Sequence, residues 1–414
     1  MTIRRQPSDF VVTELLVESG SVRSVPSAEA PFAVYALTKT SLSTPEAVNR
    51  LAGALGVRHG AVSAAGLKDK HATTVQHVAV RVRDSAQAGA MPREVGDAAA
   101  PTSGSWSAML VGWSAEEMTS QWIDRNRFTI VVRDLSRKAV AEMDRRAGVL
   151  ALGTTPSAIL FVNYFGDQRF GSARHGGGFL AARLIRGDFE GALRLAIGTP
   201  ARKDTGKKRT LTRAAAAHWG RWREMLAHVP RMPERRALEV LAAADGSKPD
   251  FRAAFAALPY FDQQIAVEAY QSHLWNAIAR RLAASIAPPA HTLTTEDPFG
   301  TMVFPAAALA EEHWMELKPP ILCRRSTLEG PWAGAATAVL AEEGITLDDL
   351  RVPGMRRPSF DHAVRPLFAR AEGFTMSRPE RDDLGASAKR LKRTLEFDLP
   401  RGAYATVVLR ALGQ

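Results

Sequence analysis

The sequence is poor in cysteine: Cys323 is the only one among its 414 residues. No disulfide can form within the chain, and a metal cluster held by several cysteines is excluded. No run of about 18 apolar residues is long enough to cross a bilayer, and Met1–Gln6 lacks the apolar segment of a secretory signal. A P-loop and a glycine-rich dinucleotide fingerprint are also missing. We therefore expect a cytoplasmic protein that needs no metal or nucleotide cofactor and does not associate with membranes.

The chain carries an excess of positive charge. It has 54 Lys and Arg against 43 Asp and Glu, a formal net charge of +11. Its hydrophobic and charged fractions, 46% and 23%, are those of a globular protein with packed cores, and its length suits two domains. A basic balance favours a polyanionic partner, and nucleic acid is a better candidate than an anionic membrane because no lipid-anchor motif is present.

One acidic residue, Asp69, stands between two lysines and a histidine in the stretch Ala65–Gln76. Such a carboxylate can be part of a solvated charge run. However, the flanking segments 60–65 and 77–83 are predicted strands, which would hold the acid on a short loop between rigid elements. Neighbouring cations favour its ionised form, which suits a nucleophile or a base. Asp69 is therefore the candidate reactive carboxylate.

A second loop, Phe161–Gly171, gathers aromatic residues, an amide, a guanidinium and two glycines after an apolar run. Together with the first stretch it resembles the TruD family of pseudouridine synthases. The family pattern G-x-K-D-x-x-A-x-T-x-Q is matched by Gly66, Lys68, Asp69, Ala72, Thr74 and Gln76. The pattern N-Y-F-G-x-Q-R-F-G is matched without departure from Asn163 to Gly171.

Shorter segments extend the resemblance. Residues 7–14 are similar to the motif P-x-D-F-x-V-x-E, in which the phenylalanine, here Phe10, contacts the target uridine; taken alone, Phe10 would be read as core. Residues 271–276 are similar to Q-S-x-L-F/W-N, and Tyr404 falls on the aromatic position of L-P-x-G-x-[FY]-A-T. The segment 114–122 lacks the basic residues that the family often has there, which puts in doubt an RNA contact from that side.

The resemblance implies a tRNA pseudouridine synthase that isomerises uridine 13 of the D-arm, with Asp69 as nucleophile or base. The reaction is redox-neutral and requires no cofactor. The expected partner is tRNA, and the expected state is a monomer. The residues expected to bind the substrate are Phe10, Asn163, Phe165 and Tyr404. Supporting roles are expected for Lys39, Lys68, Arg169 and Asn276.

Periodicity and capping residues predict the main elements. A capping box at Ser43-Thr44-Pro45-Glu46 opens a helix that ends at Gly56. Further helices are predicted over 136–152 and 260–282, strands over 9–16, 32–38, 126–133, 158–162 and 403–410, and a loop without periodicity over 85–107. Ala388–Leu399 begins basic and ends as an alternating strand.

The motifs come from both ends of the chain, which predicts a core split by an insertion. The expected fold is α/β (α+β), with a mixed, largely antiparallel sheet. The catalytic domain would comprise residues 1–171 and 356–414, and the family-specific TRUD domain would occupy 172–355 as an α/β insertion.

Three alternatives stay open at this point. The basic run from Arg202 to Arg213, with Trp219 and Trp222 after it, suits phosphate contacts and base stacking as well as it suits a solvated helical face over buried tryptophans. The protein could be a non-catalytic RNA-binding protein that keeps the fold. It could also be a hydrolase that pairs Asp69 with His71.

Overall fold

The structure is a computed structural model that describes residues 3–17, 22–27, 29–97, 104–153, 157–173, 176–200, 204, 206–244, 248–385, 387 and 389–414. The chain forms two compact units. Unit 1 comprises Met1–Phe161 and Ala369–Gln414, and unit 2 comprises Val162–Phe368. Because the first unit is assembled from both ends of the chain, the second is an insertion within it.

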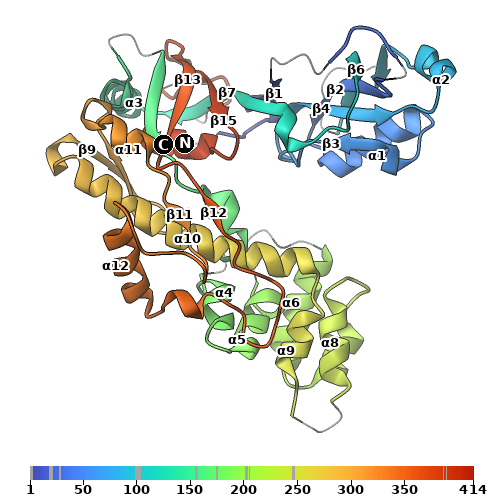
Figure 1. Ribbon diagram of the computed structural model, residues 1–414, viewed down its shortest axis with the longest axis vertical. Helices are drawn as coiled ribbons and strands as arrows, with labels where there is room; N and C mark the ends of the chain where they lie inside the picture. The colour runs from blue at the N-terminus through green and yellow to red at the C-terminus, as the bar shows by residue number, and fades with distance from the viewer. Residues whose placement is uncertain are drawn as a thin grey trace. The chain divides into compact units, whose positions relative to one another are not determined.

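Unit 1 is built on a mixed sheet, which has eleven strands within the described residues (Figure 1). The main order is β5-β6-β2-β4-β1-β7-β15-β13-β8, with β3 beside β4 and β14 beside β15. The strands are β1 (Phe10–Leu16), β2 (Phe32–Thr40), β3 (Val62–Ala64), β4 (Thr73–Arg81), β5 (Glu94–Gly96), β6 (Trp106–Ser114), β7 (Ile123–Leu135), β8 (Ala158–Val162), β13 (Phe368–Met376), β14 (Glu380–Arg381) and β15 (Leu391–Pro400). Strand β1 is parallel to β4 and antiparallel to β7, and β2 is antiparallel to both of its neighbours. The predicted mixed, largely antiparallel sheet is therefore confirmed.

The sheet brings Phe10 and Asp69 to the same place. Strands β3 and β4 are antiparallel, so residues 65–72 form the turn between them, and Asp69 lies on that turn. Strand β1 runs parallel to β4 with Val11 opposite Thr73, which sets Phe10 at the level of the turn. Buried and half-exposed residues alternate along β1, as a half-buried strand requires.

Helix α1 (Thr44–Ala54) covers one side of the β2–β4 part of the sheet. The side chain of Ser43 accepts a hydrogen bond from the Glu46 backbone N–H, and the Glu46 carboxylate accepts one from the Ser43 N–H, so the predicted capping box is confirmed. Val48 and Leu51 are buried in a core shared with Tyr35 of β2. The other helices of unit 1 are α2 (Ser85–Ala90), α3 (Arg137–Leu150) and α13 (Ala405–Ala411).

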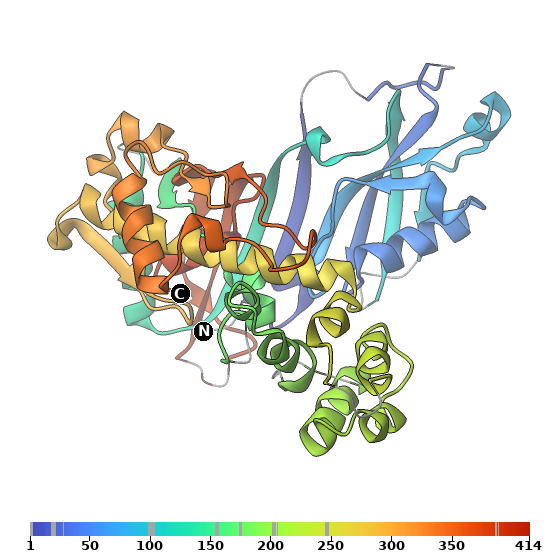
Figure 2. The same ribbon diagram turned by 60° about the horizontal axis from the view of Figure 1, so that its bottom comes forward.

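Unit 2 is mainly helical and is organised around α10 (Tyr260–Ile286), which confirms the long helix expected from 260. Helices α4 and α12 and strands β10 and β11 pack on α10, and both views show α12 beside α10 at a steep angle to it (Figures 1 and 2). A cluster of short helices, α5 to α9, packs together near the N-terminal end of α10 (Figure 1). The remaining elements are α4 (Leu180–Leu184), α5 (Phe189–Leu193), α6 (Gly206–His218), α7 (Trp222–His228), α8 (Arg235–Ala242), α9 (Phe251–Ala256), α11 (Glu312–Glu316), α12 (Ala333–Glu343), β9 (Thr292–Thr295), β10 (Met302–Pro305), β11 (Pro320–Ile321) and β12 (Ala363–Val364).

Two element predictions are wrong. The segment 403–410, expected as a strand, is helix α13, with Tyr404 as its N-cap residue. The buried residues of α13 are Ala405, Val407, Val408, Leu409 and Ala411. Three of them are consecutive and do not alternate as in a half-buried strand, so packing overrides the strand preference of the β-branched residues. The segment 85–107, expected as a loop, contains α2 and β5 and the start of β6, while its residues 98–103 lie outside the described residues.

The unit boundaries lie at 161/162 and 368/369, so the loop Phe161–Gly171 falls almost entirely in unit 2 rather than in the catalytic part proposed from the sequence. Strand β13, which follows the second boundary, was not expected. The assignment of the inserted unit to a family-specific domain stays a prediction.

Candidate active site

Asp69 is held at the tip of the 65–72 turn by donors on both of its carboxylate oxygens. The backbone N–H of His71 donates to Oδ1 at 2.9 Å, and Nη1 of Arg4 lies 2.9 Å from Oδ2. The Asp69 side chain remains 19% exposed. The carboxylate is thus oriented while still accessible to a ligand, as a nucleophile or base requires.

Arg4 lies between Asp69 and the ring of Phe10. Its guanidinium carbon is 4.3 Å from the centroid of the Phe10 ring, within cation–π distance, while its Nη1 contacts the carboxylate. Phe10 itself is only 4% exposed and packs edge-on against Phe128 at 6.1 Å. The sequence analysis missed Arg4 because its one signal, two arginines just before the P-x-D-F motif, is indistinguishable from an ordinary basic terminus.

Lys39, on β2, binds the backbone of the turn that carries Asp69. The side chain is fully buried, and its Nζ donates to the backbone oxygens of Leu42 at 2.8 Å and Asp69 at 2.9 Å. Burial lowers the pKa of Lys39 to about 8, an effect that the negative charge of Asp69 partly opposes. The structure therefore places Lys39 next to Asp69, as expected, with its ammonium bonded to the backbone of the turn.

The side chain of Lys68, the residue before Asp69, contacts strands β1 and β7. Its Nζ lies 2.8 Å from Oε1 of Glu14 and donates to Oδ1 of Asn126 at 2.7 Å. Glu14 is buried, and its second oxygen accepts the backbone N–H of His77 at 2.7 Å. Lys68 thus anchors the turn to β1 and β7, and Glu14 is the buried acid that makes this possible.

Tyr404 is half-buried at the N-cap of α13, directly after the turn that ends β15. In the sheet, Leu399 of β15 is opposite Asn126 of β7, and Asn126 is opposite Glu14 of β1. The end of β15, just before Tyr404, therefore lies beside Asn126, and Asn126 and Glu14 are the residues that bind Lys68 of the Asp69 turn.

The other expected residues, Asn163, Phe165, Arg169 and Asn276, belong to unit 2. Asn276 of α10 accepts the Phe165 backbone N–H through Oδ1 at 2.8 Å and donates from Nδ2 to the Phe165 carbonyl at 3.0 Å. The Phe165 ring, 6% exposed, packs edge-on against Trp275 at 5.7 Å. Asn276 therefore fixes the loop Phe161–Gly171 on the core helix.

A buried arginine that the sequence analysis missed, Arg365, holds Asn163. Its Nε donates to the Asn163 carbonyl and its Nη2 to Asn163 Oδ1, each at 2.7 Å. Its guanidinium also lies 4.1 Å from the centroid of the Phe165 ring. The Asn163 amide nitrogen donates to the carbonyl of Pro366 at 3.3 Å. The amide group can make two hydrogen bonds through its nitrogen and two through its oxygen, so each atom can bind one more partner besides Pro366 and Arg365. No motif marks Arg365, because it lies about 200 residues from Asn163 in the sequence.

Arg169 connects the same loop to α10. Its Nε donates to Ser272 Oγ at 3.2 Å, and its Nη2 lies 2.7 Å from Glu268 Oε2. These contacts give the expected supporting residue Arg169 a role in the structure of the loop.

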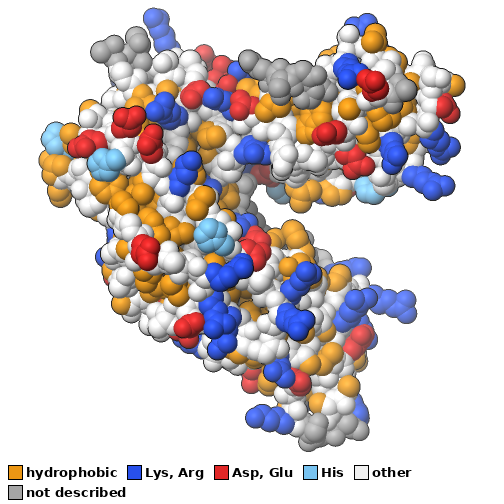
Figure 3. Space-filling view, viewed as in Figure 1, with side chains coloured by type: hydrophobic (Ala, Val, Ile, Leu, Met, Phe, Trp, Pro, Cys, Tyr) orange, Lys and Arg blue, Asp and Glu red, His pale blue; other side chains and the backbone are white. Residues whose placement is uncertain are grey.

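The basic run that begins at Arg202 is only partly described, because Arg202 and Lys203 lie outside the described residues. Within α6, Lys208 Nζ lies 3.4 Å from Glu234 and also donates to the Ala196 carbonyl. On the face in view, Lys and Arg side chains gather over the helical part of unit 2 (Figure 3). Part of the run thus supports the helix cluster, and the side chains of Lys207, Arg209 and Arg213 are exposed.

The two tryptophans after this run are packed. Trp222 is buried, and Trp219 meets it edge-on at 5.1 Å. Nε1 of Trp219 donates to Glu190, and Arg194 covers the Trp219 ring at 4.4 Å. These contacts favour the interpretation of buried tryptophans over that of rings open for base stacking.

Other chemistries find little support in the described part of the chain. The His71 ring is exposed and makes no hydrogen bond or ion pair among the described residues; only its backbone contacts Asp69. No group of three or more His, Cys, Asp or Glu side chains in the described ranges could hold a metal ion. Helices long and apolar enough to span a bilayer are likewise absent from those ranges.

Comparisons with known proteins point to one family. The family model described as tRNA pseudouridine synthase D (TruD) matches residues 1–297 and 306–412. A relative from Aquifex aeolicus named "tRNA pseudouridine synthase D" is 26% identical over 430 residues, covering 99% of this chain and 97% of the relative. One from Pyrobaculum neutrophilum, named "Probable tRNA pseudouridine synthase D", is 30% identical over 430 residues and covers 99% and 90%. A TruD crystal structure from Methanosarcina mazei superposes with a TM-score of 0.69 at 23% identity, covering 99% of this chain and 92% of that one. The last comparison supports the fold.

Proposed function

Because the chain belongs to the TruD family of tRNA pseudouridine synthases, we propose that it isomerises a uridine of tRNA to pseudouridine, with Asp69 as nucleophile or base. We further propose uridine 13 of the D-arm as the target, as the resemblance to the family implies. The observation that carries the proposal is the oriented, partly exposed Asp69 carboxylate beside the Phe10 ring, with Arg4 between them.

The reaction breaks the N1–C1′ bond of uridine and forms a C5–C1′ bond. The proton on C5 leaves and N1 gains one, so atoms and electrons balance without an oxidant or a reductant. Asp69 can attack the sugar or the base as a nucleophile, or it can assist cleavage and accept the C5 proton. Both routes need a carboxylate in a fixed orientation, and the contacts of Arg4 and the His71 N–H provide that orientation.

The position of Arg4 suggests how the base is received. A uridine inside a helical arm must first leave the stack, which costs a few kcal/mol, and stacking on an aromatic ring recovers part of that cost. A base that stacked on Phe10 next to Asp69 would take the place of the guanidinium. The guanidinium would leave the face of the ring while its Nη1 keeps its contact with the Asp69 carboxylate, a partner that its planar fork fits well.

The remaining roles are proposals of the same account. Asn163 would read the uracil edge with the hydrogen-bonding positions beyond Arg365 and Pro366, and Tyr404 would pack on the target nucleotide. Lys39 and Lys68 would position the turn of Asp69. In unit 2, Asn276 and Arg169 would hold the loop that carries Asn163 and Phe165.

A site-resolved assay tests the proposal. The purified protein is incubated with unmodified tRNA transcripts that have uridine 13 and with matched transcripts that have cytidine 13, and pseudouridine is mapped along each. We expect one pseudouridine, at position 13, in the first set and none in the second. A pseudouridine at another position would retain the activity and reject the target. Binding without any pseudouridine would favour the non-catalytic RNA-binding protein.

A further inference from the structure

A cavity in unit 1 lies beside the start of β15 and has a volume of about 780 Å³. It is lined by Ser136, Arg137, Ser387, Lys389, Arg390 and Leu391. Three of these side chains are cationic, and no carboxylate is among them. The volume is within the range of ligand-binding pockets.

Two of the three cations have no ion pair within the described part of the chain. Nε of Arg390 lies 3.1 Å from Asp134 Oδ1, which fixes its guanidinium. Arg137 and Lys389 are exposed, and neither has an ion pair with any carboxylate among the described residues. The cavity therefore has an excess of positive charge and suits an anion.

The neighbouring basic residues of the same stretch have a different use. The sequence 388–399 begins basic, and Ala388 lies outside the described residues. Nζ of Lys392 lies 2.6 Å from Asp383, and Nη1 of Arg393 lies 2.6 Å from Asp144. Those two cations are taken up in ion pairs, whereas Lys389 is left facing the cavity.

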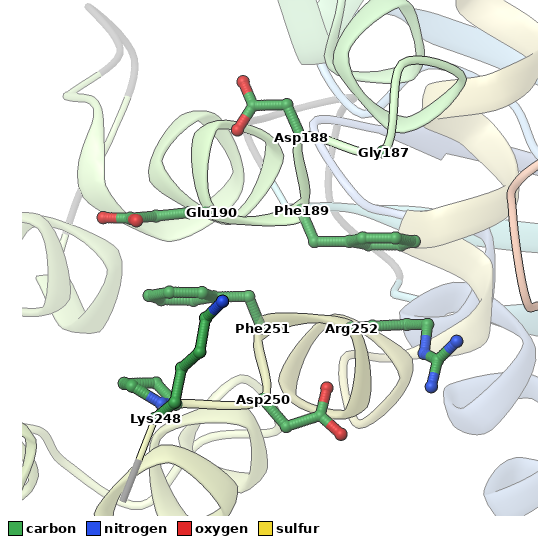
Figure 4. A pocket seen from close by; sticks show the side chains of 9 residues that line it. Gly187, Asp188, Phe189, Glu190, Lys248, Asp250, Phe251 and Arg252 are labelled. Atoms are coloured by element: carbon green, nitrogen blue, oxygen red, sulfur yellow. The ribbon is translucent and has the colours of Figure 1, made fainter.

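A cavity in unit 2 provides a contrast. It has a volume of about 450 Å³, and Figure 4 shows the rings of Phe189 and Phe251 on opposite walls with charged side chains around them. Lys248 and Arg252 are accompanied there by three carboxylates, those of Asp188, Glu190 and Asp250. Its mixed charge does not select an anion, so the cavity at Lys389 is the better phosphate site.

Buried contacts connect the rim of the Lys389 cavity with Asp9, on the turn that precedes Phe10 and β1. The backbone N–H of Asp382 donates to the Arg390 carbonyl at 2.9 Å. Arg133 Nη1 lies 2.8 Å from Asp382 Oδ1, and its Nε lies 2.9 Å from Asp9 Oδ1. Asp9 directly precedes Phe10. An anion in the cavity would therefore lie at a fixed place relative to the candidate active site.

We propose that this cavity binds a backbone phosphate of the tRNA, away from the target nucleotide, and so sets the register of the RNA on unit 1. The inference rests on the proposed function, because it takes tRNA as the substrate. Phosphate contacts of this kind position a nucleic acid without reading its sequence. Arg137 and Lys389 would supply the two charges and Arg390 a pre-oriented guanidinium.

The test compares the double variant Arg137→Ala/Lys389→Ala with the control Lys138→Ala. Lys138 is also exposed and follows Arg137 on α3 but does not line the cavity. Affinity for a fluorescent tRNA transcript and its salt dependence are measured together with turnover. We expect Kd and KM of the double variant to rise roughly tenfold with an unchanged kcat, and the slope of log Kd against log salt to become shallower by about one to two. The control should change neither slope nor KM.

The outcomes separate the two proposals. If the double variant binds with the Kd, KM and salt slope of the Lys138→Ala control, the phosphate site is rejected even when the wild type makes pseudouridine. If the wild type binds tRNA and makes no pseudouridine, the proposed function fails, and the difference in Kd between the variants still decides the phosphate site. A wild type that does not bind tRNA rejects both.

Discussion

Asp69 owes its candidate role to the groups around it. An isolated aspartate on a turn would be a solvated charge, but here one oxygen is fixed by a backbone N–H and the other by a guanidinium. Lys39 holds the backbone of the same residue from the buried side. These three contacts restrict the carboxylate without covering it, and such pre-orientation is a large part of what an active site contributes to a rate.

Replacing Arg4 tests whether the guanidinium positions this carboxylate. We expect Arg4→Met to lower kcat by roughly one to two orders of magnitude, because the carboxylate loses a fixed partner and its orientation. The matched control is Arg5→Met, which removes the same charge from the next residue, an exposed side chain without an observed ion pair in the described part of the chain. Equal activities of the two variants would show that Arg4 contributes only charge.

The lowered pKa of Lys39 predicts that turnover depends on pH. Since burial lowers the pKa of Lys39 to about 8, its ammonium is mostly charged at pH 7 and neutral at pH 9. We expect turnover to fall as pH rises through about 8, and Lys39→Met to be roughly tenfold or more slower with no such fall. The measurement is kcat from pH 6 to 9 for both proteins. A wild-type profile that stays level through pH 8 would contradict a role for this charge.

The same shift has a defined sign for stability. The folded pKa lies below the ordinary value of 10.5, so the unfolded chain binds more protons between pH 8 and 10.5. The contribution of Lys39 to the free energy of unfolding therefore rises with pH across that window and is unfavourable below it.

At the scale of elements, a buried ion network fixes the turn before β1. Arg133, 3% exposed on β7, bonds the fully buried carboxylates of Asp9 and Asp382. Asp9 Oδ2 in turn accepts the backbone N–H groups of Arg5 and Gln6 at 3.1 Å. The segment that carries Arg4 and leads into Phe10 is thereby attached to β7 and to the residues that follow β14.

Removing the cation of this network should destabilise unit 1. We expect Arg133→Met to lower the free energy of unfolding by about 3 kcal/mol, because two buried carboxylates lose their partner. The control Arg145→Met breaks an exposed pair with Glu142 and should cost less than about 1 kcal/mol. Urea unfolding of the three proteins measures both values, and a loss no larger than that of the control would mean that other groups hold the turn.

The elements that the sequence predicts well are those in which a local pattern and the packing agree. The capping box at Ser43 and the strand at 158–162 were predicted within a residue or two of their bounds. The pattern and the packing disagree in α13, where Thr406, Val407 and Val408 favour a strand but Val407, Val408 and Leu409 are buried in succession within a helix. Strand β5 has only three residues and owes its pairing to β6, so no pattern of its own predicts it.

The site shows the same division. The motif matches name Asp69, Phe10 and Asn163 as candidates because each stands in a short, recognisable stretch, and their roles stay predictions. Arg4 and Arg365 were not predicted, because their roles depend on contacts that distant parts of the chain make after folding. The prediction that Lys39 would lie near Asp69 agrees with the structure, whereas its bond to the backbone oxygen could not be read from spacing.

For the whole molecule, the excess of positive charge is the property that matters for a nucleic-acid substrate. The net charge is +11, and basic side chains gather on the helical face of unit 2 and in the Lys389 cavity of unit 1. Binding that relies on such charges releases the counterions condensed on RNA.

Affinity for tRNA should therefore depend strongly on salt. We expect Kd to rise by roughly two or more orders of magnitude between 50 and 200 mM salt if about five or more phosphates are contacted. Fluorescence anisotropy with a labelled transcript over that range gives the slope. A nearly flat profile would mean that the net charge is a matter of composition and that binding rests on non-ionic contacts.

The central claim, that Asp69 performs the isomerisation, is tested most directly by the release of tritium from tRNA labelled at C5 of uridine, since C5 loses its hydrogen only when the new bond forms. The wild type and Asp69→Asn are compared at saturating tRNA, with binding measured in parallel. The account predicts unchanged or nearly unchanged tRNA affinity and a loss of turnover of at least about a thousandfold in the variant, near the range of a removed catalytic carboxylate. Tritium release by Asp69→Asn at the wild-type rate would contradict it.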